Sequence, residues 1–404
     1  MPNYTAEIES TYDRIKDFCK RTPLIFSTTF SNHTNNNIFL KLENFQKTGS
    51  FKIRGAMNKI QKLDKSEVRN GIITASAGNH GQAIAYASKL MGYKSYVVVP
   101  QGTPINKMVA IESYGAEIIV AGKTYDEAYD YAMKLKDKKG LVFIPAYDDF
   151  DVIYGQGTIG LEIMEQCPDV DIIVVPVGGG GLISGIAAFC KSINPRIRII
   201  GVQSSAFHSM YTSFKAGKIE YSPVASLTIA DGIAVKRPGI KTFSIIKEMV
   251  DDIVLVNDDQ IANAILLLME RAKIVVEGAG ASSLAAVLNL NYFKKLREKN
   301  IVCILSGGNI DVNLINRIIT KGLIESGRIL KFSTELLDVP GALLEVLEIL
   351  KNNDANIISI DHNRNKLDIP YKEAEVIIEV ETRNQKHIER ILEALKSYNI
   401  KVIK

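Results

Sequence analysis

The sequence predicts an α/β protein built on parallel sheets, followed by a smaller C-terminal segment with a ferredoxin-like fold. Short apolar runs rich in Val and Ile alternate with helical patterns from about residue 68 onward. Three Gly- or Ser-rich loops come directly after such runs, at the strand ends where parallel sheets bind ligands. Near residue 326 the pattern changes to strand, helix, strand, strand, helix, strand, the order of a split βαβ unit.

The predicted strands of the first part are uninterrupted apolar segments, which are typical of parallel sheets covered by helices on both faces. They are GIITASA (71–77), KSYVVVP (94–100), AEIIVAG (116–122), LVFIPA (141–146), VDIIVVPV (170–177), RIRIIGVQ (196–203) and IVCILS (301–306). Between them, HGQAIAYASKLMG (80–92) and LISGIAAFCKSI (182–193) have the apolar spacing of helices.

Length and composition narrow the class of protein. At roughly 150 residues per domain, 404 residues predict two or three domains. The net charge of +4, without a long basic run, gives no electrostatic basis for binding nucleic acid. No apolar run approaches the ~20 residues needed to span a membrane. The N-terminal segment has no signal-peptide core, so we expect a cytoplasmic protein.

Metal binding and disulfides are not expected. The four cysteines lie far apart and form no CxxC pair, which is typical of reduced thiols in a cytosolic protein. The five histidines show no metal-ligand spacing.

Four consecutive glycines, Gly178–Gly181, follow a predicted buried strand and open a helix. Backbone N–H groups can converge on an oxyanion there, and the helix dipole favours negative charge. The stretch predicts a phosphate site; a flexible turn between closely packed elements is the alternative. It matches neither the dinucleotide-binding motif nor the P-loop.

Three further polar residues, Asn79, His80 and Ser306, lie near the ends of predicted strands. Asn79 and His80 follow one strand, either to grip a ligand or to act as turn and helix-cap residues. Ser306 closes another strand, where its hydroxyl can meet a ligand nitrogen or cap the next turn. Lys52 stands among small residues after Phe51. With the phosphate site, these groups predict a phosphorylated aromatic aldehyde bonded to the lysine amine.

The motifs GSFKIRGA, SAGNHGQA, GGGGL, TIADGIAV, VEGAGA and LSGGN resemble, in the same order, those of threonine dehydratases (threonine ammonia-lyases). These are pyridoxal-phosphate enzymes of the tryptophan-synthase-β type. The resemblance covers about residues 5–325 and implies a catalytic domain of pyridoxal-phosphate fold type II over 1–326, with a smaller subdomain inserted at about 50–148. Residues 327–404 resemble an ACT domain, a regulatory module with a ferredoxin-like fold.

The resemblance implies a role for each motif residue. Lys52 would hold pyridoxal 5′-phosphate as an imine, with Phe51 beside the ring. Asn79 would hydrogen-bond the ring hydroxyl, and Ser306 would meet the pyridine nitrogen. The residues expected to hold the phosphate are Gly178, Gly179, Gly180, Gly181 and Leu182. The residues expected to receive the substrate carboxylate are Ser76, Ala77, Gly78, Asn79 and His80.

The activity implied is β-elimination from L-threonine to give 2-oxobutanoate and ammonia, and from L-serine to give pyruvate. Lys52, once freed by the substrate, would remove the α-proton, with a pKa lowered by burial or by other cations. Because the hydroxyl of Ser306 is neutral, it does not force the pyridine nitrogen to stay protonated. A weaker electron sink favours prompt elimination over transamination.

Rival activities remain open at this point. Serine racemases of the same group carry SSGNHG, in which the second serine acts as an acid and base; here that position is Ala77, which favours elimination. Cysteine-synthase-like enzymes carry TSGNTG instead. A non-catalytic amino-acid sensor would need a degraded Lys52 or glycine loop, and both are intact.

Two acidic residues have open roles. Glu277 opens a predicted helix, either as a structural helix start or as a group that approaches the cofactor. Asp231 lies in a motif that is close to a cation-binding loop in related enzymes. A bound monovalent or divalent cation is therefore an alternative to a site without metal.

The C-terminal resemblance implies regulation. ACT domains bind ligands where sheets pair side by side, near the turn after the first strand. The effector contacts implied here are Gly341, Asn356 and Ile357. A branched-chain amino acid, isoleucine or valine, is the effector expected of an enzyme in isoleucine biosynthesis. A degradative enzyme without such inhibition, or a purely structural dimerisation module, is the alternative. A homo-oligomer, dimer or tetramer, is expected.

Overall fold

The computed structural model describes residues 3–221, 227–365 and 367–403. The chain divides into two compact units, residues 1–310 and 311–404. Helix α14 (Val312–Glu325) falls within the second unit. The domain boundary expected at residue 326 stays a prediction.

The first unit contains a six-stranded sheet in the order β1-β2-β10-β7-β8-β9. Every neighbouring pair in it is parallel except β1 with β2. The strands are β1 (Leu24–Phe26), β2 (Asn37–Lys41), β7 (Ile172–Pro176), β8 (Arg198–Ser204), β9 (Asp252–Val256) and β10 (Asn300–Ile304). The predictions of β7, β8 and β10 are confirmed. The sequence analysis did not identify β1, β2 and β9, which are short strands of three to five residues.

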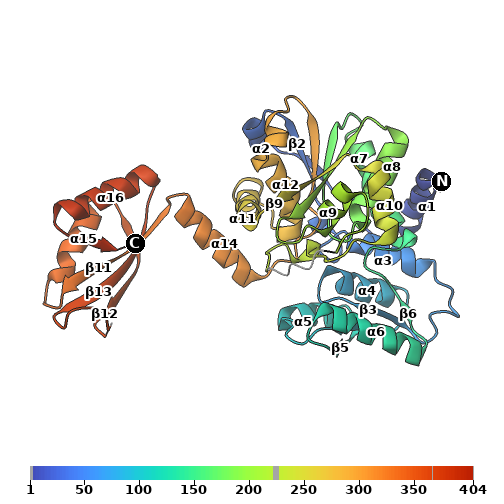
Figure 1. Ribbon diagram of the computed structural model, residues 1–404, viewed down its shortest axis with the longest axis horizontal. Coiled ribbons are helices and arrows are strands. Elements are labelled where there is room, and N and C mark those ends of the chain that lie inside the picture. Colours follow the sequence, from blue (N-terminus) through green and yellow to red (C-terminus); the bar gives the residue numbers. More distant parts are fainter. Residues whose placement is uncertain (1–2, 222–226, 366, 404) are drawn as a thin grey trace. The chain divides into compact units, whose positions relative to one another are not determined.

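A second sheet of the same unit has four parallel strands in the order β5-β4-β3-β6. They are β3 (Ile72–Ala75), β4 (Ser95–Val99), β5 (Glu117–Val120) and β6 (Val142–Phe143), and all four were predicted. In chain order they lie between β2 and β7, so this smaller sheet is inserted between strands of the larger one (Figure 1).

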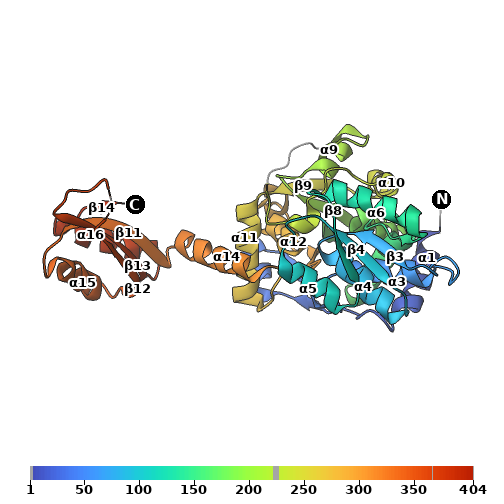
Figure 2. The same cartoon turned by 90° about the horizontal axis from the view of Figure 1, so that it is seen from below.

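Helices cover both faces of the smaller sheet, with α6 on one face and α4 and α5 on the other (Figure 2). The helices of the first unit are α1 (Tyr4–Ile15), α2 (Thr28–Thr34), α3 (Lys52–Gln61), α4 (Asn79–Leu90), α5 (Ile105–Ser113), α6 (Tyr125–Lys139), α7 (Phe150–Gln166), α8 (Gly181–Ile193), α9 (Ser209–Ala216), α10 (Ile240–Met249), α11 (Asp258–Leu267), α12 (Gly278–Asn289) and α13 (Asn291–Lys294). Across the described ranges, no helix is long and apolar enough to cross a membrane.

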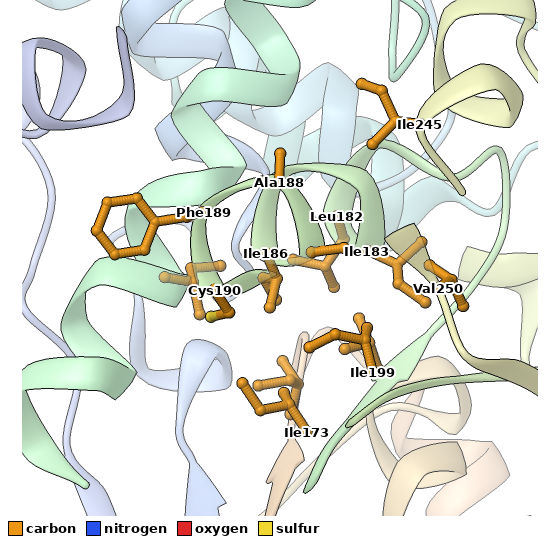
Figure 3. Packing of buried hydrophobic residues seen from close by; sticks show 14 of the residues in the cluster. Ile173, Leu182, Ile183, Ile186, Ala188, Phe189, Cys190, Ile199, Ile245 and Val250 are labelled. Carbon is orange, nitrogen blue, oxygen red and sulfur yellow. The ribbon is translucent and has the colours of Figure 1, made fainter. Parts of the chain in front are cut away.

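A large apolar core lies under helix α8. Its side chains Ile183 and Ile186 point toward Ile173 of β7 and Ile199 of β8, and all four are almost fully buried (Figure 3). Because α8 begins at the glycine loop, this packing also fixes the position of that loop.

The second unit has the predicted order βαββαβ after helix α14. Its elements are β11 (Ile329–Leu337), α15 (Ala342–Asn352), β12 (Asn356–Asn363), β13 (Glu373–Glu381), α16 (Gln385–Ser397) and β14 (Val402–Ile403). The strands form an antiparallel sheet in the order β12-β13-β11-β14, and both helices pack their apolar faces against it. The predicted ferredoxin-like fold is confirmed.

Four buried charges tie the start of helix α3 to the larger sheet. Arg54 pairs with Glu43 and with Glu162, each at 2.7 Å. Lys41 of β2 pairs with Glu162 of α7 at 2.6 Å. These four side chains are at most 1% exposed. The two positive charges balance the two negative ones, so none of the four is left unpaired in the interior.

Replacing Glu162 by Ala should leave Lys41 and Arg54 buried with one carboxylate between them. We expect this change to lower the free energy of unfolding by about 3–5 kcal/mol. The matched control is Glu165→Ala on the same helix, where Glu165 pairs with Arg21 in a half-exposed bridge and the expected loss is about 0–1 kcal/mol. Urea unfolding measures both. Equal losses for the two variants would contradict the prediction.

Candidate active site

Lys52 is the first residue of helix α3, directly after the cap residue Phe51. Its amine donates a hydrogen bond to the carbonyl oxygen of Ala146 at 2.9 Å and lies 5.2 Å from the centre of the Phe51 ring. Burial lowers the pKa of the Lys52 amine to about 8, although the carboxyl of Glu277 acts to raise it. No salt bridge to Lys52 occurs among the described residues.

Backbone hydrogen bonds join the segment before Lys52 to the loop that carries Ser306. The N–H of Phe51 donates to the carbonyl oxygen of Ser306 at 3.1 Å, and the N–H of Gly308 donates to that of Gly49 at 2.8 Å. Ser306 is 2% exposed. Lys52 and Ser306, which are far apart in the sequence, therefore belong to the same site.

Asn79 opens helix α4, with Gly78 in the cap position. Its amide nitrogen lies 2.9 and 3.0 Å from the two carboxyl oxygens of Glu277. Its amide oxygen accepts from Asn309 at 2.7 Å. These contacts link the second predicted motif to the loop after Ser306, and they bring Glu277 into the same site.

The expected substrate-carboxylate site, residues 76–80, consists of the loop before helix α4 and the first two residues of that helix. Ser76, Ala77, Gly78 and Asn79 are partly buried, and His80 is buried. The side chain of Ser76 accepts from the N–H of Gly78 at 3.2 Å. His80 hydrogen-bonds the carbonyl oxygen of Ile144 at 3.1 Å, and burial lowers its pKa to about 3. The imidazole is therefore neutral at physiological pH and is oriented by the backbone after β6.

The glycine loop forms the start of helix α8. Gly180 has a positive φ of 98° and caps the helix, while Leu182 is buried in the core of the larger sheet. A side chain at Gly179 would collide with the ring of Tyr147. The hydroxyl of Thr242 donates to the carbonyl oxygen of Gly179 at 2.7 Å. The loop therefore has a fixed conformation, with bare backbone at a helix N-terminus.

The sequence analysis missed three residues of this site. Tyr147 and Thr242 shape the glycine loop, and Asn309 holds Asn79. Tyr147 directly follows the predicted strand 141–146, so its place at a strand end was a usable signal. Asn309 ends the LSGGN motif, which gave a role only to Ser306. No sequence signal marks Thr242, because its role depends on a contact between distant segments.

These residues fit the expected pyridoxal phosphate. The fit rests on a partly buried amine with a lowered pKa and on a glycine loop whose N–H groups precede a helix. Ser306 accepts a backbone hydrogen bond from Phe51, and Asn79 is linked through Asn309 to the carbonyl oxygen of Thr48, four residues before Lys52. Lys52 would hold the aldehyde carbon and Gly178–Gly181 the phosphate.

The remaining predicted positions are those expected to bind a cation and an effector. Asp231 forms a salt bridge with Lys107 at 2.6 Å, and within the described part of the chain no three His, Cys, Asp or Glu side chains gather as metal ligands. In the second unit, Gly341 caps α15 with a positive φ of 93°, and Asn356 donates to Glu381 at 3.0 Å. Ile357 is 38% exposed. The cation and effector roles stay predictions.

Comparison with known proteins finds similarity to enzymes that depend on pyridoxal phosphate. The family model described as pyridoxal-phosphate dependent enzyme matches residues 15–307. The chain is 46% identical over 399 residues to an L-threonine ammonia-lyase of Thermotoga maritima, covering 98% of each chain. A serine racemase from maize has a TM-score of 0.75 and 37% identity, covering 80% of this chain and 98% of that one. The processed threonine deaminase isoform 2 of Solanum lycopersicum has a TM-score of 0.74 and 38% identity, covering 78% and 86%.

The lowered pKa of Lys52 predicts a pH dependence. The neutral amine is the nucleophile, so the rate at which the cofactor-free protein takes up pyridoxal phosphate should rise with pH and reach half its maximum near pH 8. The measurement is the growth of visible absorbance after mixing. A free lysine derivative serves as the control and corrects for titration of the aldehyde. A corrected rate still rising steeply above pH 9, as for an ordinary lysine with a pKa of about 10.4, would contradict the prediction.

Proposed function

The chain belongs to the family of pyridoxal-phosphate dependent enzymes, and on this premise we propose that it is a threonine ammonia-lyase. It converts L-threonine to 2-oxobutanoate and ammonia, and L-serine to pyruvate and ammonia. The observation that carries the proposal is the amine of Lys52, with its lowered pKa, at the start of a fixed helix. Its hydrogen-bond partner Ala146 directly precedes Tyr147, whose ring packs against the glycine loop at Gly179. The similarity to the Thermotoga maritima L-threonine ammonia-lyase over 98% of the chain supports this substrate class.

The reaction removes the β-hydroxyl as water, and water later replaces the amino nitrogen, so no oxidant is needed. Bound pyridoxal phosphate supplies an electron sink for the pair released at the substrate α-carbon. Lys52 takes the α-proton, and its pKa of about 8 leaves a usable fraction of neutral amine near pH 7. Ser306 would offer a neutral hydroxyl to the cofactor nitrogen, and Gly178–Gly181 would hold the phosphate.

The loop of residues 76–80 is the proposed site for the substrate carboxylate. Its N–H groups precede helix α4, where the helix dipole favours an anion. His80 is neutral and held by the backbone, so the N–H groups, and not a cationic imidazole, would bind the carboxylate.

Serine racemisation is the second candidate, because the maize serine racemase shares the fold at 37% identity. Racemisation needs a proton donor on the face of the α-carbon opposite Lys52. At the position where racemases carry that serine, this chain has Ala77, which has no ionisable proton. Elimination, which needs a base on one face only, is therefore favoured.

The ferredoxin-like unit is proposed to regulate the enzyme by binding an amino acid, through Gly341, Asn356 and Ile357. Gly341 precedes helix α15, whose N-terminus favours a carboxylate. In a dimer or tetramer, such binding would change subunit packing. Adding L-isoleucine or L-valine to the keto-acid assay should change the activity of wild type and leave that of Gly341→Ala unaltered. If neither amino acid changes the activity of wild type, the proposal that isoleucine or valine is the effector is wrong.

Replacing Lys52 by Ala tests the proposed activity. The wild-type protein should turn yellow with pyridoxal phosphate, retain the cofactor after borohydride reduction, and form keto acid from L-threonine and L-serine. Lys52→Ala should remain colourless after dialysis and lose keto-acid formation by at least about a thousandfold. Lys59→Ala on the same helix, outside the site, is the matched control. Formation of D-serine from L-serine at a rate matching pyruvate would instead support the racemase.

A further inference from the structure

The amide of Asn79 is held from both sides by polar groups. On one side its nitrogen lies 2.9 and 3.0 Å from the carboxyl oxygens of Glu277. On the other side its oxygen accepts from the amide nitrogen of Asn309 at 2.7 Å. An asparagine amide can be turned by 180° with little change in shape, so its partners decide which end is the donor.

The orientation of Asn309 is itself fixed. Its amide nitrogen also donates to the carbonyl oxygen of Thr48 at 2.9 Å, and a backbone carbonyl can only accept. Asn309 must therefore present N–H to Asn79. The donor direction runs from Asn309 to Asn79 and from Asn79 to Glu277.

Glu277 closes this chain of hydrogen bonds. It is 6% exposed and caps helix α12, and its N–H donates to the carbonyl oxygen of Gly307 at 3.0 Å. A side chain at Gly307 would collide with the Glu277 carboxyl, so the glycine lets the carboxyl lie against this loop. The carboxyl thus lies between the motif loop that carries Ser306 and the start of helix α4.

We propose that Glu277 is a positioning residue that, together with Asn309, locks the amide of Asn79 with its N–H side available to the ring oxygen of the cofactor. This inference rests on the proposed function and on the contact with the ring hydroxyl that the family resemblance implies for Asn79. An ionised carboxylate accepts hydrogen bonds only. Turning the amide would place its oxygen against the carboxylate and its N–H group against that of Asn309, and both contacts are repulsive.

The restraint on the orientation of the Asn79 amide depends on the charge of Glu277. Burial raises the pKa of its carboxyl to about 7; Asp231 also raises it, while the hydrogen bond from Asn79 and the cations Lys107 and Lys52 lower it. Once protonated, the carboxyl can donate as well as accept, so one of the two repulsive contacts that exclude the turned amide is removed and only the contact with Asn309 remains. The restraint on the amide orientation is therefore strongest above pH 7 and weakens as the pH falls below 7.

Glu277→Gln and Asn309→Ala test the proposal from the two sides of Asn79. At pH 8 each should raise the Kd for pyridoxal phosphate about tenfold. The ratio of Kd at pH 6 to Kd at pH 8 should fall at least about threefold in Glu277→Gln relative to wild type, because Gln does not titrate. The matched control is Asn37→Ala, which removes an exposed Asn–Asn hydrogen bond to Asn300. This control should bind the cofactor as wild type does.

The thermal unfolding of the cofactor-free proteins separates positioning from a structural role. Since Glu277→Gln removes a buried charge, its Tm at pH 8 should equal or exceed that of wild type. A lower Tm together with weaker binding would assign Glu277 to structure and overturn the proposal, as would wild-type affinity and pH dependence in both variants. If wild type itself fails to bind the cofactor, the proposed function fails instead.

Discussion

The candidate site depends on the buried ion pairs around Arg54. This residue lies two positions after Lys52 on helix α3, and its guanidinium contacts both Glu43 and Glu162. Any shift of the helix along its axis would break these contacts and leave charges unpaired in the interior, at a cost of several kcal/mol. The amine of Lys52 is thus held against the carbonyl of Ala146 by charges that take no part in the chemistry. Rigid support of this kind is what a reactive group needs.

Around that amine, groups from both sheets of the first unit meet. The loops after β3 and β6 supply Asn79 and Ala146, and the loops after β7 and β10 supply the glycines and Ser306. All four loops lie at the carboxyl ends of parallel strands, where such folds place ligands. Close approach of backbones is possible because glycines stand where side chains would collide, as at Gly179 beside Tyr147.

Burial shifts the pKa values of three titratable groups in the site, Lys52, His80 and Glu277. Near Lys52, burial lowers the pKa of the amine and keeps His80 neutral. Near Asn79, burial raises the pKa of Glu277 into the range where it titrates. Perturbed pKa values gather where a protein performs chemistry. Here Lys52 is itself expected to hold the cofactor, while Glu277 contacts Asn79 and His80 directly follows it. The same burial that makes these groups useful also destabilises their charged forms, a cost offset by packing elsewhere.

The sequence alone determined seven of the parallel strands, the βαββαβ order of the second unit and the motif loops, because burial imposes local periodicity and glycine marks tight turns. The seven strands predicted for the first unit are all present. Only the tertiary structure decided how the loops meet. Asn79 is 198 residues from Glu277 and 230 residues from Asn309, and Thr242 is 63 residues from Gly179. Such pairings depend on how the two sheets and the starts of helices α10 and α12 pack together, and local periodicity carries no information about that arrangement.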